Sequence, residues 1–265
     1  MNVRDLVSGA RMRLRRARGK PANPWYDFDS AEADPRSPDL PPATSELARI
    51  FFDHKGRPIH KWVHYLDLYD RHFGPYRNSK PTFMEIGVQN GGSMEMWRKY
   101  FGDEAIIFGI DVDPACAGNV TPPNQVRIGS QADPDFLRSV IAEMGAPDIV
   151  LDDGSHVAEH QRESFRTLFP ALKEGGLYAI EDTHTAYWPG RHQGGFRRRG
   201  TAIEFVKNMI DDMHAWYHRH PTATSAKTQV GAIHFYDSII FIEKQRRTAP
   251  VHTKVSLPSR GADAG

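Results

Sequence analysis

The sequence predicts an α/β protein in which helices cover both faces of a mostly parallel sheet. Short apolar runs typical of buried strands alternate with segments whose apolar residues recur at helical spacing. Glycine-rich turns separate several of these segments, and polar side chains directly follow most of the strand-like runs. The chain has 265 residues, of which 39% are hydrophobic. This is enough for one substantial core or at most two small domains.

The body of the chain begins with two helical segments and then alternates strands with helices. Apolar spacing predicts the helices 45–52, 61–73, 93–100, 133–144, 157–172 and 201–218. The strand-like runs are 82–88, 105–111, 125–128, 148–152 and 177–181, followed by a strand pair at 231–236 and 239–244. In parallel sheets of this kind, ligands bind at the carboxyl ends of the strands.

The two ends of the chain are basic. Residues 1–20 carry a charge of +6 and residues 244–265 carry +4, so the total of +1 leaves −9 for the segment between them. A basic arm can contact an anionic membrane surface or nucleic acid. The alternative interpretation is a solvated, disordered arm, which we favour.

Composition also predicts where the folded domain lies. Six prolines within residues 21–42 exclude a regular helix or a central strand there. We expect a basic, Pro-rich and largely disordered arm over 1–44 and a disordered tail over 246–265. The folded domain is expected over 45–245, and its first part, 45–80, is expected to form a helical cap.

Several classes of protein are excluded. One cysteine, Cys116, cannot form an internal disulfide framework or a Cys-rich metal site. The longest apolar runs, such as 105–110, are far shorter than the roughly 20 residues that cross a bilayer. The basic N-terminal segment lacks the apolar core of a secretory signal. We therefore expect a cytoplasmic protein.

A glycine-rich turn follows the first strand, with the sequence EIGVQNGGS from Glu85 to Ser93. A dinucleotide-binding turn would have a second glycine where Gln89 stands. The pattern E-x-G-x-x-x-G-x-S is instead typical of the S-adenosylmethionine loop of class I methyltransferases. Asp111, at the end of the next strand, can accept hydrogen bonds from both ribose hydroxyls. The alternative is an ordinary strand–helix connection that needs a positive φ angle.

Two acidic pairs end two strands that follow each other along the chain. Asp152 and Asp153 follow one strand, and Glu181 and Asp182 follow the next. Neighbouring strands lie about 4.8 Å apart, so the last three carboxylates can converge and would repel each other without a cation. Oxygen ligands favour Mg²⁺, Mn²⁺ or Ca²⁺, and His156 could then act as a general base. The alternative is that the carboxylates only cap the following helices or turns.

Three stretches closely resemble a family of metal-dependent, S-adenosylmethionine-dependent sugar O-methyltransferases. They are 83–93 (FMEIGVQNGGS), 149–156 (IVLDDGSH) and 175–188 (GGLYAIEDTHTAYW). The family includes macrolide-sugar and rhamnosyl O-methyltransferases and proteins labelled cephalosporin hydroxylases, and the resemblance covers about residues 50–244. It implies a Rossmann-like class I methyltransferase fold over 45–245, with a seven-stranded sheet whose last strand is antiparallel.

The resemblance also implies a set of site residues. Mg²⁺ would be bound by Asp153, Glu181 and Asp182, with His156 as the catalytic base. Many relatives have Ser or Thr where this chain has Arg57-Pro58, in the segment that lies over the cofactor. The implied S-adenosylmethionine positions are Glu85, Gly87, Gln89, Asn90, Gly91, Ser93, Asp111, Ser130, Gln131, Asp152 and Tyr65.

The implied reaction is Mg²⁺-dependent transfer of a methyl group from S-adenosylmethionine to a sugar hydroxyl. The acceptor would be a glycosylated natural product or an envelope glycan with adjacent hydroxyls, and no nucleic-acid partner is expected. The basic arm could add a peripheral membrane contact, and the chain could form a homo-oligomer. One alternative is an oxygenase, although such enzymes usually need two histidines and one carboxylate. The other is a non-catalytic protein that binds S-adenosylmethionine or carbohydrate.

Overall fold

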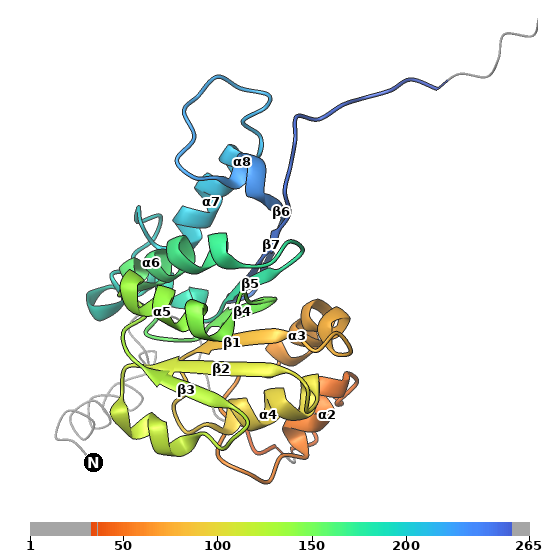
Figure 1. The fold of residues 1–265 in the computed structure, drawn as a ribbon, viewed down its shortest axis with the longest axis vertical. Helices are drawn as coiled ribbons and strands as arrows, with labels where there is room; N and C mark the ends of the chain where they lie inside the picture. Colours follow the sequence, from red (N-terminus) through yellow and green to blue (C-terminus); the bar gives the residue numbers. More distant parts are fainter. Residues whose placement is uncertain (1–32, 36, 256–265) are drawn as a thin grey trace, which may run out of the picture.

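The structure is a computed structural model that describes residues 33–35 and 37–255, and its centre is a seven-stranded sheet (Figure 1). The strand order is β3-β2-β1-β4-β5-β7-β6. Strands β1 to β5 pair in parallel, whereas β7 is antiparallel to both β5 and β6. The predicted sheet with its antiparallel last strand is confirmed. The strands are β1 (Thr82–Ile86), β2 (Ile106–Asp111), β3 (Gln125–Ile128), β4 (Ile149–Asp152), β5 (Leu177–Ile180), β6 (Val230–Tyr236) and β7 (Ile239–Lys244).

Helices pack on both faces of this sheet. Side chains of α2, α3 and α4 share one core cluster with one face, and side chains of α5, α6 and α7 share a second cluster with the other. The strands serve both clusters, because successive side chains point to opposite faces: Leu151 belongs to the first cluster and Val150 to the second. The helices are α2 (Glu46–Phe52), α3 (Tyr65–Phe73), α4 (Gly92–Phe101), α5 (Pro134–Met144), α6 (Ala158–Leu168), α7 (Ala202–Met213) and α8 (Ala226–Gln229).

Short 3₁₀ segments complete the described secondary structure. Three of them lie in loops that follow β2 and β5 at the carboxyl edge of the sheet. The segments are η1 (Gly74–Tyr76), η2 (Pro114–Asn119), η3 (Phe169–Ala171), η4 (Thr183–Tyr187) and η5 (Gly190–His192).

Three predicted helices are shorter than expected. The helix predicted over 61–73 begins at Tyr65, because the preceding segment turns over the carboxyl edge of the sheet. The helix predicted over 157–172 ends at Leu168 and continues as the 3₁₀ segment η3, which contains proline. The helix predicted over 201–218 ends at Met213. At this end, the Asp212 carboxylate accepts hydrogen bonds from the backbone of the loop that follows the helix.

The expectations for the two ends of the chain fall largely outside the described residues. This holds for the basic arm over 1–32, with its expected disorder and membrane contact, and for the end of the tail at 256–265. The first described helix, α2, begins at Glu46, and the last strand ends at Lys244. Among the helices of the described part, none combines the length and the apolar character that crossing a membrane requires.

Candidate active site at the carboxyl edge of the sheet

A cavity of about 370 Å³ opens at the carboxyl ends of β1, β2, β4 and β5. This is the point where the strand order reverses, since β1 leads to β2 on one side and its other neighbour is β4. Ligands of open α/β sheets bind at such a point. The predicted site residues that line the cavity are Gly87, Gln89, Asp111, Ser130, Gln131, Asp153, His156, Glu181 and Asp182.

Two glycines of the glycine-rich turn combine a positive φ angle with a position that has no room for a side chain. Gly87 has a φ of +92°, and a Cβ atom there would lie 2.2 Å from the carbonyl oxygen of Asp153. Gly91 has a φ of +81°, and a Cβ atom would lie 2.1 Å from the carbonyl oxygen of Asn119. The turn therefore fits closely against the loops after β4 and β2, and Gly91 caps helix α4 without lining the cavity.

Asp111 holds the same turn from the neighbouring strand. Its Oδ2 accepts hydrogen bonds from the backbone N–H groups of Val88 and Gln89, at 2.9 and 3.0 Å. Its Oδ1 accepts one from the N–H of Asp113 at 3.0 Å. Partial burial raises the pKa of the Asp111 carboxyl, but these donors outweigh burial and hold the pKa below its usual range. The carboxylate stays charged and lines the cavity.

Glu85 and Ser93, both predicted to bind cofactor, lie behind the cavity wall. The Ser93 hydroxyl donates to Glu85 Oε2 at 2.7 Å, and the indole N–H of Trp97 donates to Oε1 at 3.2 Å. Glu85 is fully buried, and burial raises its pKa to about 7. These contacts join the end of β1 to α4. Asn90, in the same turn, is exposed and does not line the cavity either.

Asp152 is also buried, and it positions the loop that carries His156. Its carboxylate accepts hydrogen bonds from Ser164 at 2.6 Å, Gln131 at 3.0 Å and Tyr178 at 3.2 Å. The other end of the Gln131 amide accepts a hydrogen bond from the Ser155 N–H at 2.7 Å. Burial raises the pKa of Asp152. Asp152 therefore acts through Gln131 on the cavity wall and does not line it.

The acidic strand ends do converge, and they converge on the histidine. His156 Nε2 lies 3.8 Å from Asp153 Oδ1 and 3.7 Å from Asp182 Oδ2. One ligand atom of each residue lies within 4.8 Å of the others, close enough to hold a metal ion. His156 and Asp182 both have positive φ angles, +54° and +53°, and such strained conformations concentrate at functional sites. His156 Nδ1 is buried, with no hydrogen-bond partner among the described residues.

Lys61 is the main site residue that the sequence analysis missed. Its Nζ donates to Asp153 Oδ2 at 2.5 Å and to Glu181 Oε1 at 2.8 Å, and it lies 3.8 Å from Glu85 Oε1. Burial lowers the pKa of Lys61, but the three carboxylates outweigh burial and raise it. Glu181 thus faces Lys61, outside the group formed by Asp153, His156 and Asp182. Burial, followed by repulsion from Asp153, raises the pKa of Glu181 well above its usual range.

Tyr65 orients Asp182 from the start of α3. Its hydroxyl lies 2.9 Å from both Asp182 Oδ1 and the carbonyl oxygen of Ser238. Burial and the charge of Asp182 raise the pKa of this phenol. Tyr65, predicted to contact the cofactor, is buried and does not line the cavity. It lies beneath Asp153, His156 and Asp182, which together are called the acidic group.

The loop after β5 packs against His156 at one point. His192 is buried, and its Nδ1 lies 3.3 Å from the carbonyl oxygen of His156. Phe196 is 79% exposed, and the Arg197 guanidinium lies over its ring at 5.3 Å. The arginines at 197–199 do not line the cavity.

Comparisons with known proteins identify the family. A rhamnosyl tetracenomycin-C 2'-O-methyltransferase of Streptomyces olivaceus is 33% identical over 249 residues, which cover 83% of this chain and 64% of that protein. A 3'-O-methyltransferase acting on a methoxyrhamnosyl tetracenomycin-C, from the same organism, is 38% identical over 217 residues, 77% of this chain and 55% of that protein. The chain belongs to this family of sugar O-methyltransferases.

A solved structure of the same family supports this assignment. The MycE methyltransferase of the mycinamycin biosynthetic pathway, in complex with Mg, SAH and mycinamycin VI, matches with a TM-score of 0.67 and 34% identity over 77% of this chain. The match covers 54% of MycE, and the chain spans between about half and two thirds of the sugar O-methyltransferases it matches. The predicted family and fold are confirmed. No family model matches the chain.

Proposed function

We propose that this protein transfers a methyl group from S-adenosylmethionine to a sugar hydroxyl of a glycosylated small molecule, with Mg²⁺ bound. The observation that carries the proposal is the meeting of Asp153, His156 and Asp182 on one wall of a cavity. Another wall of that cavity is made by the Gly87 turn and Asp111. The printed substrates of the relatives, and the Mg and SAH of the MycE structure, support the same chemistry.

The residues that line the cavity suit both S-adenosylmethionine and Mg²⁺. The Gly87 turn leaves no room for a side chain and lets the backbone approach a ligand closely. Asp111 would accept hydrogen bonds from the ribose hydroxyls, since its carboxylate is charged and lines the cavity. Asp153 and Asp182 offer the oxygen ligands that a hard cation prefers. Glu181, which shares the Lys61 ammonium with Asp153, would supply a third.

In this proposal, His156 would act as the general base. When bound, S-adenosylmethionine supplies a sulfonium methyl group, and Mg²⁺ lowers the pKa of an acceptor hydroxyl. His156 Nε2 would take the hydroxyl proton, and the resulting imidazolium would be stabilised by the carboxylates of Asp153 and Asp182. The bond from the acceptor oxygen to the methyl carbon forms as the carbon–sulfur bond breaks. The cavity walls would hold the reactants in line, and such positioning supplies much of the acceleration of a direct transfer.

The experiment is a transfer assay with methyl-labelled S-adenosylmethionine and Mg²⁺. The acceptors are a rhamnosylated polyketide, a deoxysugar macrolide and an envelope polysaccharide. We expect methylated sugar on one of the two small glycosides and no product after EDTA treatment. If only the polysaccharide is labelled, the acceptor is an envelope glycan and not a small glycoside. If the protein binds S-adenosylmethionine but methylates no glycoside, the proposed function is wrong.

The role of His156 is tested in the same assay. His156→Gln should lower kcat by about 10²- to 10⁴-fold, the usual contribution of a general base, with an unchanged circular dichroism spectrum. The matched control is His220→Gln, since His220 is exposed and does not line this cavity. This control should keep wild-type activity. Near-wild-type turnover by His156→Gln would remove His156 from the mechanism.

A further inference from the structure

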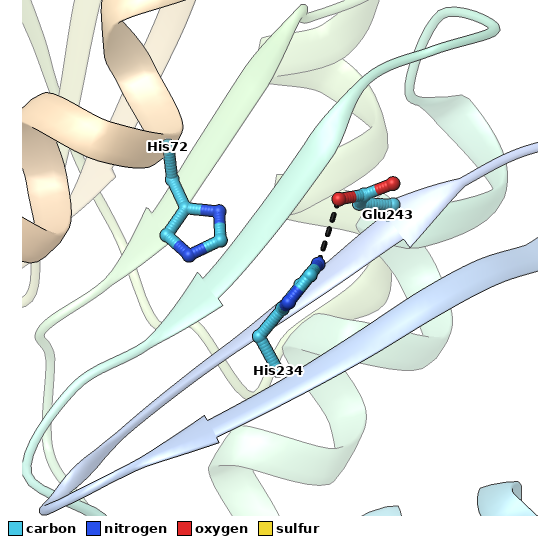
Figure 2. A group of neighbouring side chains, drawn as sticks. All are labelled: His72, His234 and Glu243. Carbon is cyan, nitrogen blue, oxygen red and sulfur yellow. Dashed lines mark hydrogen bonds and ion pairs between the residues drawn. The ribbon is translucent and has the colours of Figure 1, made fainter.

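A second group of side chains of the types that bind metals lies where α3 packs against the hairpin of β6 and β7. Figure 2 shows His72 reaching from the helix towards His234 on one strand and Glu243 on the other. One ligand atom of each residue lies within 4.8 Å of the others. Glu243 pairs with Leu177, the first residue of β5, so the group extends towards the edge of the sheet opposite the cavity. The proposed reaction uses none of the three.

We propose that His72, His234 and Glu243 bind a divalent transition-metal ion of the Zn²⁺ class, which clips helix α3 to the β6–β7 hairpin. Two imidazoles and one carboxylate form a donor set that suits Zn²⁺ and not Mg²⁺. His234 Nε2 lies 2.7 Å from Glu243 Oε1. In a tetrahedral site with metal–ligand bonds of about 2.0–2.1 Å, ligand atoms are roughly 3.3 Å apart, so this pair need open only slightly.

The surroundings hold His72 in place. Its ring stacks on Phe241 with 4.1 Å between ring centroids and an interplanar angle of 17°. Its Nε2 lies 3.0 Å from the Tyr236 hydroxyl, a contact of the kind that orients metal-bound imidazoles. Burial, then His234 and Arg71, lower the His72 pKa to about 4, against the opposing charge of Glu243.

An ion has a route to this group. His72 and Glu243 both line a cavity of about 570 Å³ on the surface beside them. The side chains of His234 and Glu243 are 34% and 46% exposed. A three-ligand site with such exposure leaves a fourth position for water, as a tetrahedral ion requires.

The bound ion would connect helix α3 to the β6–β7 hairpin, and these two elements also meet at Tyr65, which contacts Asp182. Helix α3 begins with Tyr65, whose hydroxyl contacts both Asp182 and Ser238. Ser238 lies in the turn between β6 and β7. An ion shared by His72, His234 and Glu243 joins this helix to this hairpin a second time, nearer the other edge of the sheet. We therefore expect the bound ion to raise the stability of the folded protein.

The test is a titration of the full chain with Co²⁺ as a spectroscopic probe, in excess Mg²⁺ so that the acidic group is occupied. Wild type should bind about one equivalent, with visible absorption typical of a tetrahedral ion, and Zn²⁺ should displace it and raise Tm. His234→Gln and Glu243→Gln should each weaken binding at least tenfold. Asp182→Asn should bind like wild type, and circular dichroism checks the fold of each variant.

Three outcomes overturn the proposal. The first is that wild type binds no Co²⁺ or Zn²⁺ in excess Mg²⁺. The second is that both His234→Gln and Glu243→Gln fold and bind like wild type. The third is that binding is lost in Asp182→Asn and kept in His234→Gln, which would assign the ion to the acidic group of the active site.

Discussion

Replacing Lys61 with methionine removes a buried cation that contacts three carboxylates. The side chain is only 2% exposed, and its Nζ lies 2.5, 2.8 and 3.8 Å from Asp153, Glu181 and Glu85. At an effective dielectric constant of about 20, each of the two shorter contacts is worth about 6 kcal/mol before desolvation is counted. Burial offsets much of this, and removing one partner of a buried ion pair costs about 3–5 kcal/mol net. In EDTA, we therefore expect Lys61→Met to lower Tm by about 6–20 °C.

The penalty should depend on pH with a defined sign. Without Lys61, the neighbouring carboxyls are harder to ionise, and burial already raises the pKa values of Glu181 and Glu85. A carboxyl whose pKa is higher in the folded state contributes stability below its unfolded pKa, and this contribution is lost as pH rises through the folded pKa. The cost of Lys61→Met should therefore be larger at pH 8 than at pH 5.

Urea unfolding at pH 5 and pH 8, with and without Mg²⁺, measures the effect. Mg²⁺ should restore part of the lost stability, because a cation at the acidic group replaces the missing charge. The matched control is Lys207→Met: Lys207 pairs with Glu204 at 2.7 Å but is 49% exposed. This control should cost about 0.5 kcal/mol or less. A Lys61→Met penalty under about 1 kcal/mol at pH 8, or one that does not change with pH, would refute the reasoning.

Three further predictions concern residues around the cavity. Burial raises the Glu85 pKa from its ordinary 4.5 to about 7. This corresponds to about 3 kcal/mol of stability that is present below pH 4.5 and lost as pH rises through about 7. Glu85→Gln should flatten the fall in urea stability between pH 5 and pH 8, and an unchanged slope would contradict the assignment. Gly87→Ala combines a φ of +92° with a Cβ 2.2 Å from a carbonyl oxygen, and should cost at least about 2 kcal/mol. Gly118→Ala, with nothing within 4 Å of the added Cβ, should be nearly neutral; equal Tm values for the two variants would refute the steric argument. Tyr65→Phe removes a hydroxyl from Asp182 and should cost about 1.5–3 kcal/mol and weaken Mg²⁺ binding. Wild-type Mg²⁺ affinity by calorimetry would show that Tyr65 does not position Asp182.

Much of the fold could be predicted because secondary structure depends on local patterns. Strand β3 has the predicted bounds, and α5 begins directly after its predicted first residue, Asp133, whose side chain accepts hydrogen bonds from the first turn. Helix α7 ends five residues before its predicted end. The backbone of a loop further along the chain donates hydrogen bonds to the Asp212 carboxylate there. No local pattern encodes that contact.

The candidate site, too, could be predicted only in part from the sequence. The sequence placed Asp111, Asp153 and Asp182 at strand ends, and strand ends of a parallel sheet share one edge. It could not separate residues that line the cavity from those that support it, because Glu85, Asp152 and Tyr65 differ from lining residues only in side-chain direction and burial.

The sequence by itself determined the alternation of strands and helices, the glycine turn, the acidic strand ends and the family, since each of these lies within a short stretch of chain. Only the tertiary structure decided that Lys61 reaches residues 92 and 120 positions away, and that His72 meets His234 and Glu243. Such contacts depend on how α3 and the segment before it pack against the sheet. That packing is set by the two cores as a whole, and the residues that it brings together carry no shared pattern along the chain.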